Sequence, residues 1–318
     1  MPVRFILDCD TGSDDAIAIF AATAHPGLDL VAVTTVDGNV TLEQTTENTL
    51  RVLDHVGARI PVYAGAARPF VRPDLPIPRA VLNKGNAFQK SYLDLPAAVS
   101  TVGEGSAVTF LIDTYMDDAN ADVALVAVGP LTNIALALAV EPRLAARIPR
   151  LVIMGGAHGN GNVTASAEFN FWADPEAAEA VLSAGIRDVV VVSLDATHSA
   201  PLTNVDCDGL DTVGTPAATA AAMLIRHRLR HDQAAVESID DVASPVHDPV
   251  CVALLVRPDI ATESVRAFAS VETMGARTLG ELIVDTRSWC PEPPNATVVL
   301  RASTDVYREF LREAFTRG

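Results

Sequence analysis

Short apolar runs alternate with longer helical segments along the first two thirds of the chain. The apolar runs have the length of buried strands and occupy residues 3–7, 28–36, 60–65, 121–129, 150–156 and 188–195. Helical patterns cover residues 14–24, 105–118, 131–140 and 174–185, and another helix is predicted to open at Thr41, where "TLEQ" has the spacing of a capping box. This order predicts an α/β fold: an open, mostly parallel, Rossmann-like sheet with helices on both faces.

The pattern changes after Val265, so the sheet is expected to be mixed. Strand-like pieces occupy residues 265–275, 278–287 and 295–302, and a helix follows them. Residues 66–100 are rich in proline and show no clear periodicity, which predicts a long loop close to a site. No linker, repeat or low-complexity tract interrupts the pattern, and residues 1–318 are interpreted as a single domain.

Composition and charge exclude several classes of partner. The net charge of −17 argues against binding to nucleic acid, which needs basic patches. The longest apolar stretch, residues 123–140, is broken by Gly129-Pro130, so no membrane span is expected. The four cysteines show no CxxC spacing, and the first ten residues lack the apolar run of a signal peptide. We therefore expect a cytoplasmic protein whose partner is a small molecule.

Four aspartates, Asp8, Asp10, Asp14 and Asp15, follow the first predicted strand within eight residues. Ligand sites in open α/β sheets lie beyond the carboxyl ends of the strands, which is where these side chains fall. Clustered carboxylates repel one another unless a cation lies among them, and oxygen ligands favour a hard cation such as calcium or magnesium. No cluster of cysteine and histidine accompanies them, which argues against zinc. Calcium suits an irregular site that is assembled from several loops.

The four aspartates also admit interpretations without a hydrolytic calcium site. Asp14 and Asp15 could simply complement the first turn of a helix, where negative charge is favoured. An EF-hand is excluded, because the twelfth position counted from Asp8 is Ile19. A magnesium-dependent phosphatase of the haloacid dehalogenase type, with Asp8 as nucleophile, is weakened by Gly12, where that motif needs threonine or valine.

Six segments resemble, in order, those of the inosine-uridine preferring nucleoside hydrolase family. They are "DCDTGSDDA" from Asp8, "VDGN" from Val36, "GPLTNIALAL" from Gly129, residues 154–178, "HDPV" from His247, and "ELIVDTR…PPNATVVL" from Glu281. The resemblance implies an enzyme that uses Ca²⁺ to hydrolyse the N-glycosidic bond of ribonucleosides, giving ribose and the free base. It also implies a homodimer or homotetramer.

The resemblance also implies roles for particular residues. Asp10 would activate a metal-bound water as general base, and His247 would assist the leaving base. Asp8 would support the ligand aspartates without being a metal ligand itself. The implied metal ligands are Asp10, Asp15, Asp248 and the backbone carbonyl of Val128. The implied substrate-binding residues are Asp14, Asn39, Met154, Asn162, Glu168 and Asn170.

Two segments depart from the family pattern. Asn83, Lys84 and Gly85 stand where members often have a His-Gly pair. Residues 221–233 lack the aromatic side chains that often line the base pocket, and carry Arg226, His227, Arg228 and His231. The preferred base is therefore left open, and so is a non-standard ribosyl substrate. A non-catalytic, nucleoside-binding protein is a further alternative, although it gives Asp10 and His247 no purpose.

Overall fold

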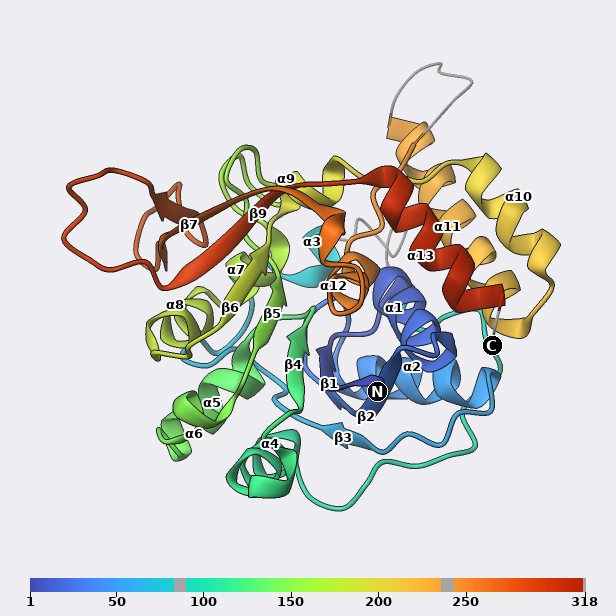
Figure 1. Ribbon diagram of the computed structural model, residues 1–318, viewed down its shortest axis with the longest axis horizontal. Coiled ribbons are helices and arrows are strands. Elements are labelled where there is room, and N and C mark those ends of the chain that lie inside the picture. The colour runs from blue at the N-terminus through green and yellow to red at the C-terminus, as the bar shows by residue number, and fades with distance from the viewer. Residues whose placement is uncertain (83–89, 236–242, 317–318) are drawn as a thin grey trace.

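The computed structural model describes residues 1–82, 90–235 and 243–316, and these parts form one sheet of nine strands (Figure 1). The strand order is β3-β2-β1-β4-β5-β6-β9-β7-β8. All neighbours from β3 to β9 are parallel, whereas β7 is antiparallel to both β9 and β8. The strands are β1 (Val3–Cys9), β2 (Leu28–Thr35), β3 (Val62–Ala64), β4 (Ala124–Ala127), β5 (Leu151–Met154), β6 (Val189–Val192), β7 (Ala261–Val271), β8 (Leu282–Asp285) and β9 (Ala296–Ala302). The predicted α/β fold with a mostly parallel, mixed sheet is confirmed.

Helices cover both faces of the sheet, as predicted. One core lies under α1, α2 and α10 to α13, and the other lies under α4, α5, α6 and α8 (Figure 1). The α-helices are α1 (Ser13–Ala24), α2 (Leu42–His55), α3 (Arg79–Leu82), α4 (Ala107–Met116), α5 (Thr132–Val140), α6 (Leu144–Arg147), α7 (Phe169–Ala173), α8 (Pro175–Ser183), α9 (Leu194–His198), α10 (Asn204–Val213), α11 (Pro216–Ala235), α12 (Asp248–Leu254) and α13 (Thr304–Thr316). Two 3₁₀ turns, η1 (Asp118–Asn120) and η2 (Pro258–Ile260), are also present.

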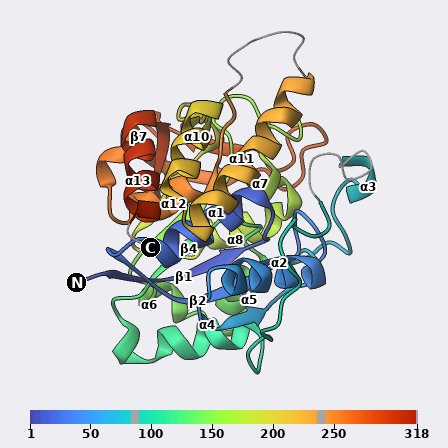
Figure 2. The same cartoon turned by 90° about the vertical axis from the view of Figure 1, so that its right-hand side faces the viewer.

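Strand β1 shows why its sequence is apolar at consecutive positions. Successive side chains of a strand point to opposite faces, so Phe5, Leu7 and Cys9 enter the first core while Ile6 enters the second. Both faces are covered, and an alternating apolar-polar pattern is therefore absent from this strand. Helix α1, which follows β1 directly, packs against α11 and α12 (Figure 2).

Element boundaries differ from the predictions mainly where a side chain ends or begins a helix. The predicted helix 105–118 is shorter in the structure, because Ser106 caps the start of α4 by accepting from the N–H of Thr109 at 3.2 Å. Asp117 ends it by capping η1, where its side chain accepts from the N–H of Ala119 at 3.0 Å. The capping box at Thr41 is confirmed as the start of α2.

The proline-rich segment 66–100 contains the four-residue helix α3, and its other described residues are irregular. Contacts with other elements hold it: the N–H of Phe70 donates to Asp174 at 2.7 Å, and Arg72 pairs with Glu176 at 2.7 Å. In the parts of the chain with assigned structure, no helix is long and apolar enough to cross a membrane. The strands of the one sheet draw on residues from 3 to 302, and a single domain stays our prediction for the chain.

The order of the strands creates a switch point beside β1. From β1 the chain builds outward through β2 to β3, and it then returns to the other side of β1 and builds outward through β4, β5 and β6. Crevices at such reversals, outside the carboxyl ends of the strands, are the usual ligand sites of open α/β sheets. Here β1 ends just before Asp10 and β4 ends just before Val128.

Candidate active site

Asp10 lies at the carboxyl end of β1, in a space that two glycines leave open. A Cβ atom added to Gly38 would fall 2.1 Å from Oδ2 of Asp10, and one added to Gly129 would fall 2.9 Å from its Oδ1. The backbone N–H of Asn39 donates to Oδ2 of Asp10 at 2.6 Å. The loops after β2 and β4 therefore enclose this buried carboxylate and fix its direction.

Asp15 joins the start of α1 to the end of β1. Its Oδ2 accepts from the N–H of Gly12 at 2.9 Å, and its Oδ1 accepts from the N–H of Asp10 at 3.2 Å. The side-chain amide of Asn39 also reaches Oδ2 of Asp15, at 3.4 Å, and the backbone carbonyl of Asp10, at 3.3 Å. The "DCDTGSDDA" and "VDGN" segments thus meet in space, as their positions after neighbouring strands predict.

Three carboxylates come together beside Asp10. One oxygen each from Asp14, Asp15 and Asp248 lies within 4.8 Å of the others, and all three residues are buried. The first two come from the first turn of α1, and Asp248 is the first residue of α12. The sequence-based ligand set named Asp10 in place of Asp14, and the structure places Asp10 next to this group with its carboxylate turned toward the Asn39 N–H.

Burial makes the charged form of these carboxylates costly. Loss of hydration, followed by the charge of Asp14, raises the pKa of Asp15 to about 7. Burial and Asp15 raise the pKa of Asp10 well above its ordinary value, and burial together with Asp14, Asp15 and Asp10 does the same for Asp248. The cluster is therefore short of positive charge.

Arg228 is a buried cation beside the cluster. Its Nη1 lies 3.2 Å from Oδ1 of Asp14 and also donates to Oγ of Ser13 at 3.2 Å, and its Nε donates to the carbonyl of Pro245 at 3.2 Å. The guanidinium lowers the pKa of Asp248, but it does not outweigh burial and three neighbouring aspartates. One arginine thus offsets only part of the negative charge.

The donor atoms of the cluster fit a hard divalent cation. Each member offers carboxylate oxygen, which calcium and magnesium prefer, and the group is buried at a switch point of the sheet. The carbonyl oxygen of Val128 lies at the end of β4 and accepts from the side-chain amide of Asn170 at 2.9 Å, which leaves a lone pair for another partner. A bound cation would remove the repulsion among the aspartates.

Asp8 supports the cluster from inside the protein. It is fully buried, and its Oδ2 accepts from Oγ1 of Thr34 at 2.5 Å and from Nδ2 of Asn133 at 2.8 Å. Its Oδ1 has no hydrogen-bond partner among the described residues, and burial raises its pKa to about 6 despite those two donors. Because Thr34 and Asn133 hold this carboxylate in the interior, the structure disfavours the phosphatase alternative with Asp8 as nucleophile.

Glu168 and Asn170 line the same end of the sheet from α7. Glu168 caps this helix, accepting from the N–H groups of Asn170 at 2.8 Å and Phe171 at 3.2 Å, and it also accepts from Gly156 at 2.9 Å. Burial raises its pKa to about 7 even so. Asn170 donates to the carbonyls of Val128 at 2.9 Å and Met154 at 3.1 Å, and thereby joins the ends of β4 and β5. Met154 is itself buried.

Asn162 differs from the other predicted substrate-binding residues because it is exposed. It lies in the loop between β5 and α7, where its N–H donates to the carbonyl of Ala167 at 3.2 Å. The same loop is held at its start by Asp195, which accepts from the N–H groups of His158 at 2.7 Å and Gly159 at 3.0 Å. The structure thus places Asn162 on a surface loop that leads to the buried side chains of Glu168 and Asn170 at the start of α7.

His247 immediately precedes Asp248 and forms the N-cap position of α12. Its Nδ1 lies 2.7 Å from Oγ1 of Thr197, and its ring centroid is 5.6 Å from that of His198. Loss of hydration lowers the pKa of His247 to about 3, with Arg228 acting in the same direction and Asp14 opposing the shift. His247 is therefore neutral at pH 7. One ring nitrogen can donate a hydrogen bond and the other can accept one, but the ring lacks the additional proton of an imidazolium.

Arg228, Thr197 and Asn133 contact Asp14, His247 and Asp8, respectively, and these contacts were not predicted from the sequence. The sequence did carry a signal for Arg228, because apolar residues recur at helical spacing at Ala218, Ala221, Ile225 and Leu229, and position 228 falls on the same face. Among the departures from the family pattern, Asn83, Lys84 and Gly85 lie outside the described residues.

Residues 5–309 match the family model of the inosine-uridine preferring nucleoside hydrolases. The chain therefore belongs to this family, and it is an enzyme, a ribonucleoside hydrolase. Its relatives include the pyrimidine-specific ribonucleoside hydrolase RihA of Escherichia coli O7:K1, which is 39% identical over 317 residues and 98% of each chain. The protein of the same name from Salmonella agona is 38% identical with the same coverage.

Solved structures of the same kind superpose over nearly the whole chain. A purine-preferring ribonucleoside hydrolase from Gardnerella vaginalis gives a TM-score of 0.87 at 27% sequence identity, covering 98% of each chain. The plant nucleoside hydrolase PpNRh1 gives a TM-score of 0.84 at 28% identity, with all of both chains covered. The fold predicted from the sequence is thus the fold of known nucleoside hydrolases.

Proposed function

We propose that this chain is a calcium-dependent N-ribohydrolase, which splits ribonucleosides into ribose and a free base. The observation that carries the proposal is the buried group of Asp14, Asp15 and Asp248, with Asp10 beside it, at the switch point of the sheet. The family is metal-dependent. Calcium suits the site because its donors come from separate loops and because calcium accepts irregular coordination.

Asp10, Asp15, Asp248 and the carbonyl oxygen of Val128 are the proposed metal ligands. When bound, the ion would supply Lewis-acid activation of a water molecule. Asp10 would act as the general base that takes the proton of the attacking water. The Asn39 N–H and the two enclosing glycines keep that carboxylate in one direction.

The ribose would be held by Asp14, Asn39, Asn162, Glu168 and Asn170, with Met154 packed beside it. Carboxylates and amides suit a sugar diol because its hydroxyls both donate and accept hydrogen bonds. Hydrolysis at C1′ proceeds through an oxocarbenium-like transition state. Hydrogen bonds to the ribose hydroxyls that strengthen as the ring flattens would lower the barrier.

His247 would assist the leaving base through a hydrogen bond, in line with its neutral form at pH 7. Replacing it by alanine is expected to lower kcat/KM for inosine or uridine by about 10²-fold. The loss on p-nitrophenyl riboside should be much smaller, since that leaving group needs little assistance. Measuring kcat/KM for both substrates checks the role, and equal losses on the two would contradict it.

The relatives differ in the base that their names give. The 39% identical RihA is called pyrimidine-specific, whereas the structurally similar Gardnerella vaginalis protein, at 27% identity, is called purine-preferring. The higher identity favours uridine and cytidine as substrates of this chain, and we propose them first. A cytoplasmic location and assembly into a homodimer or homotetramer stay predictions.

Ribose release from a panel of uridine, cytidine, inosine and adenosine tests the proposal. Reducing sugar should appear with calcium present, should disappear after chelation, and should return when calcium is added back. Release from none of the four, with calcium bound, would point to a non-standard ribosyl substrate or to a non-catalytic binding protein. Release that survives chelation would contradict the proposed metal dependence.

A further inference from the structure

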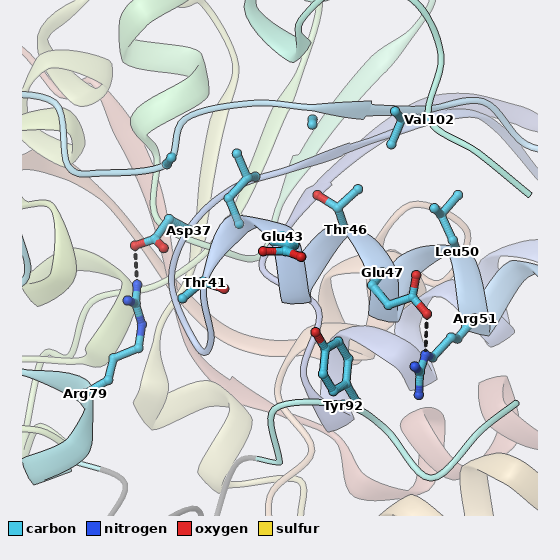
Figure 3. A pocket seen from close by; sticks show the side chains of 13 residues that line it. Asp37, Thr41, Glu43, Thr46, Glu47, Leu50, Arg51, Arg79, Tyr92 and Val102 are labelled. Atoms are coloured by element: carbon cyan, nitrogen blue, oxygen red, sulfur yellow. Dashed lines mark hydrogen bonds and ion pairs between the residues drawn. The ribbon is translucent and has the colours of Figure 1, made fainter. Parts of the chain in front are cut away.

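Arg79, the first residue of α3, attaches the proline-rich segment to the turn that follows β2. Its Nε donates to the carbonyl of Gly38 at 2.8 Å, and its Nη2 forms an ion pair with the carboxylate of Asp37. Figure 3 shows this pair at one end of a pocket of about 790 Å³. One arginine thus binds two consecutive residues of the turn, one through the side chain and one through the backbone.

The same turn is in direct contact with Asp10. The residue after Gly38, Asn39, donates its N–H to Oδ2 of Asp10 at 2.6 Å, and Gly38 packs so closely that a Cβ atom there would overlap that oxygen. A shift of the turn would therefore move the hydrogen-bond donor that directs the Asp10 carboxylate. It would also move the Asn39 side chain, whose amide contacts Asp15 at 3.4 Å.

Backbone hydrogen bonds also hold the turn. The N–H of Asp37 donates to Ala66 at 3.0 Å, and the N–H of Gly38 donates to Val40 within the turn at 3.2 Å. Asp37 is only 8% exposed, and burial raises its pKa while Arg79 lowers it. Arg79 therefore favours the charged form of a buried carboxylate and at the same time satisfies the neighbouring carbonyl.

The opposite end of the pocket offers a matched comparison (Figure 3). There Arg51 pairs with Glu47 at 2.7 Å along α2, and its Nη1 donates to the carbonyls of Leu93 at 3.3 Å and Leu95 at 3.4 Å. Like Arg79, it joins a carboxylate to backbone carbonyls and involves the proline-rich segment. Unlike Arg79, it hydrogen-bonds to α2 and to residues 93–95 rather than to the turn that directs Asp10.

We propose that Arg79 is a positioning residue for hydrolysis: by holding Asp37 and Gly38 it fixes the turn whose Asn39 N–H directs the Asp10 carboxylate. The inference rests on the proposed function, in which Asp10 is the general base. A residue of the proline-rich segment would thus affect catalysis through the turn that contacts Asp10. Its effect should be larger in kcat than in KM, because it acts mainly on the direction of the base, while a displaced Asn39 would also weaken ribose binding.

The experiment compares Arg79→Met, Arg79→Lys and Arg51→Met with the unchanged protein. Steady-state kcat and KM are measured on the nucleoside that the panel shows to be hydrolysed fastest, together with the melting temperature of each variant. Small misplacements of reacting groups cost up to about 10²-fold in rate. Arg79→Met should lower kcat by about 10-fold or more with a smaller change in KM, and Arg51→Met should stay within about 2-fold of the unchanged kcat.

Arg79→Lys separates positioning from stability. Lysine keeps the charge near Asp37 but lacks the planar fork that also reaches the Gly38 carbonyl. It should restore the melting temperature while recovering kcat only in part, whereas in a purely structural role kcat would follow the melting temperature. That second pattern overturns the inference, as does an unchanged kcat in a folded Arg79→Met, or an equal kcat loss in Arg51→Met. If the unchanged protein releases no ribose, the proposed function fails and the inference fails with it.

Discussion

Replacing Asp10 by asparagine is expected to lower kcat for nucleoside hydrolysis by about 10²- to 10⁴-fold, the range that general-base catalysis contributes. Asparagine has nearly the same shape, and its oxygen can still accept from the Asn39 N–H, as Oδ2 of Asp10 does at 2.6 Å. The substitution therefore removes the base while leaving the packing between Gly38 and Gly129 nearly intact. Ribose release under saturating substrate and calcium gives the rate.

A matched control for this prediction is Asp122→Asn, which changes an exposed aspartate paired with Arg4 at 2.8 Å. The control should keep the unchanged kcat, because it lies outside the active site. Full activity in folded Asp10→Asn would remove Asp10 from the mechanism and would transfer the role of general base to another carboxylate of the cluster.

Replacing Asp248 by asparagine is expected to abolish most of the stabilisation by calcium. A ligand that binds only the folded state adds RT ln(1 + [L]/Kd), or about 2.7 kcal/mol at 100 times Kd. In chelator, the variant should be at least as stable as the unchanged protein, because burial and three neighbouring aspartates oppose ionisation of Asp248. Thermal unfolding in chelator and in excess calcium measures both effects.

Asp259→Asn is the corresponding control, since Asp259 is exposed and pairs with Arg257 at 2.9 Å. Its melting temperature should rise with calcium by the same amount as that of the unchanged protein. An equal rise in Asp248→Asn would show that calcium binds elsewhere and would contradict the proposed ligand set.

The order of elements was predictable from sequence because the physical signals are local. Apolar runs such as residues 189–192 mark strands buried on both faces, and a capping box marks the start of α2, where the Thr41 N–H donates to Oε1 of Gln44 at 3.3 Å. The polar residues after those strands then had to meet at one edge of the sheet. Asp10 and Asn39 could be placed together on that basis alone.

Contacts that depend on the rotation of a helix about its axis, or on an irregular segment, were harder to predict from the sequence. Arg226 and Arg228 are two residues apart on α11, yet one pairs with Asp208 on the outside and the other with buried Asp14. Arg79 comes from a segment without periodicity, so nothing local indicates its partner. Helix α7 was also missed, because its five residues are too few to show a helical period.

The positions of the clustered acids along the chain have a consequence for biosynthesis. Asp14 and Asp15 are near the start of the chain, whereas their partners Arg228 and Asp248 come more than two hundred residues later. Contacts between such distant segments form only after long loops have closed. After Asp14 and Asp15 are made, a growing polypeptide must therefore add more than two hundred further residues before α11 and α12 can complete the acidic cluster.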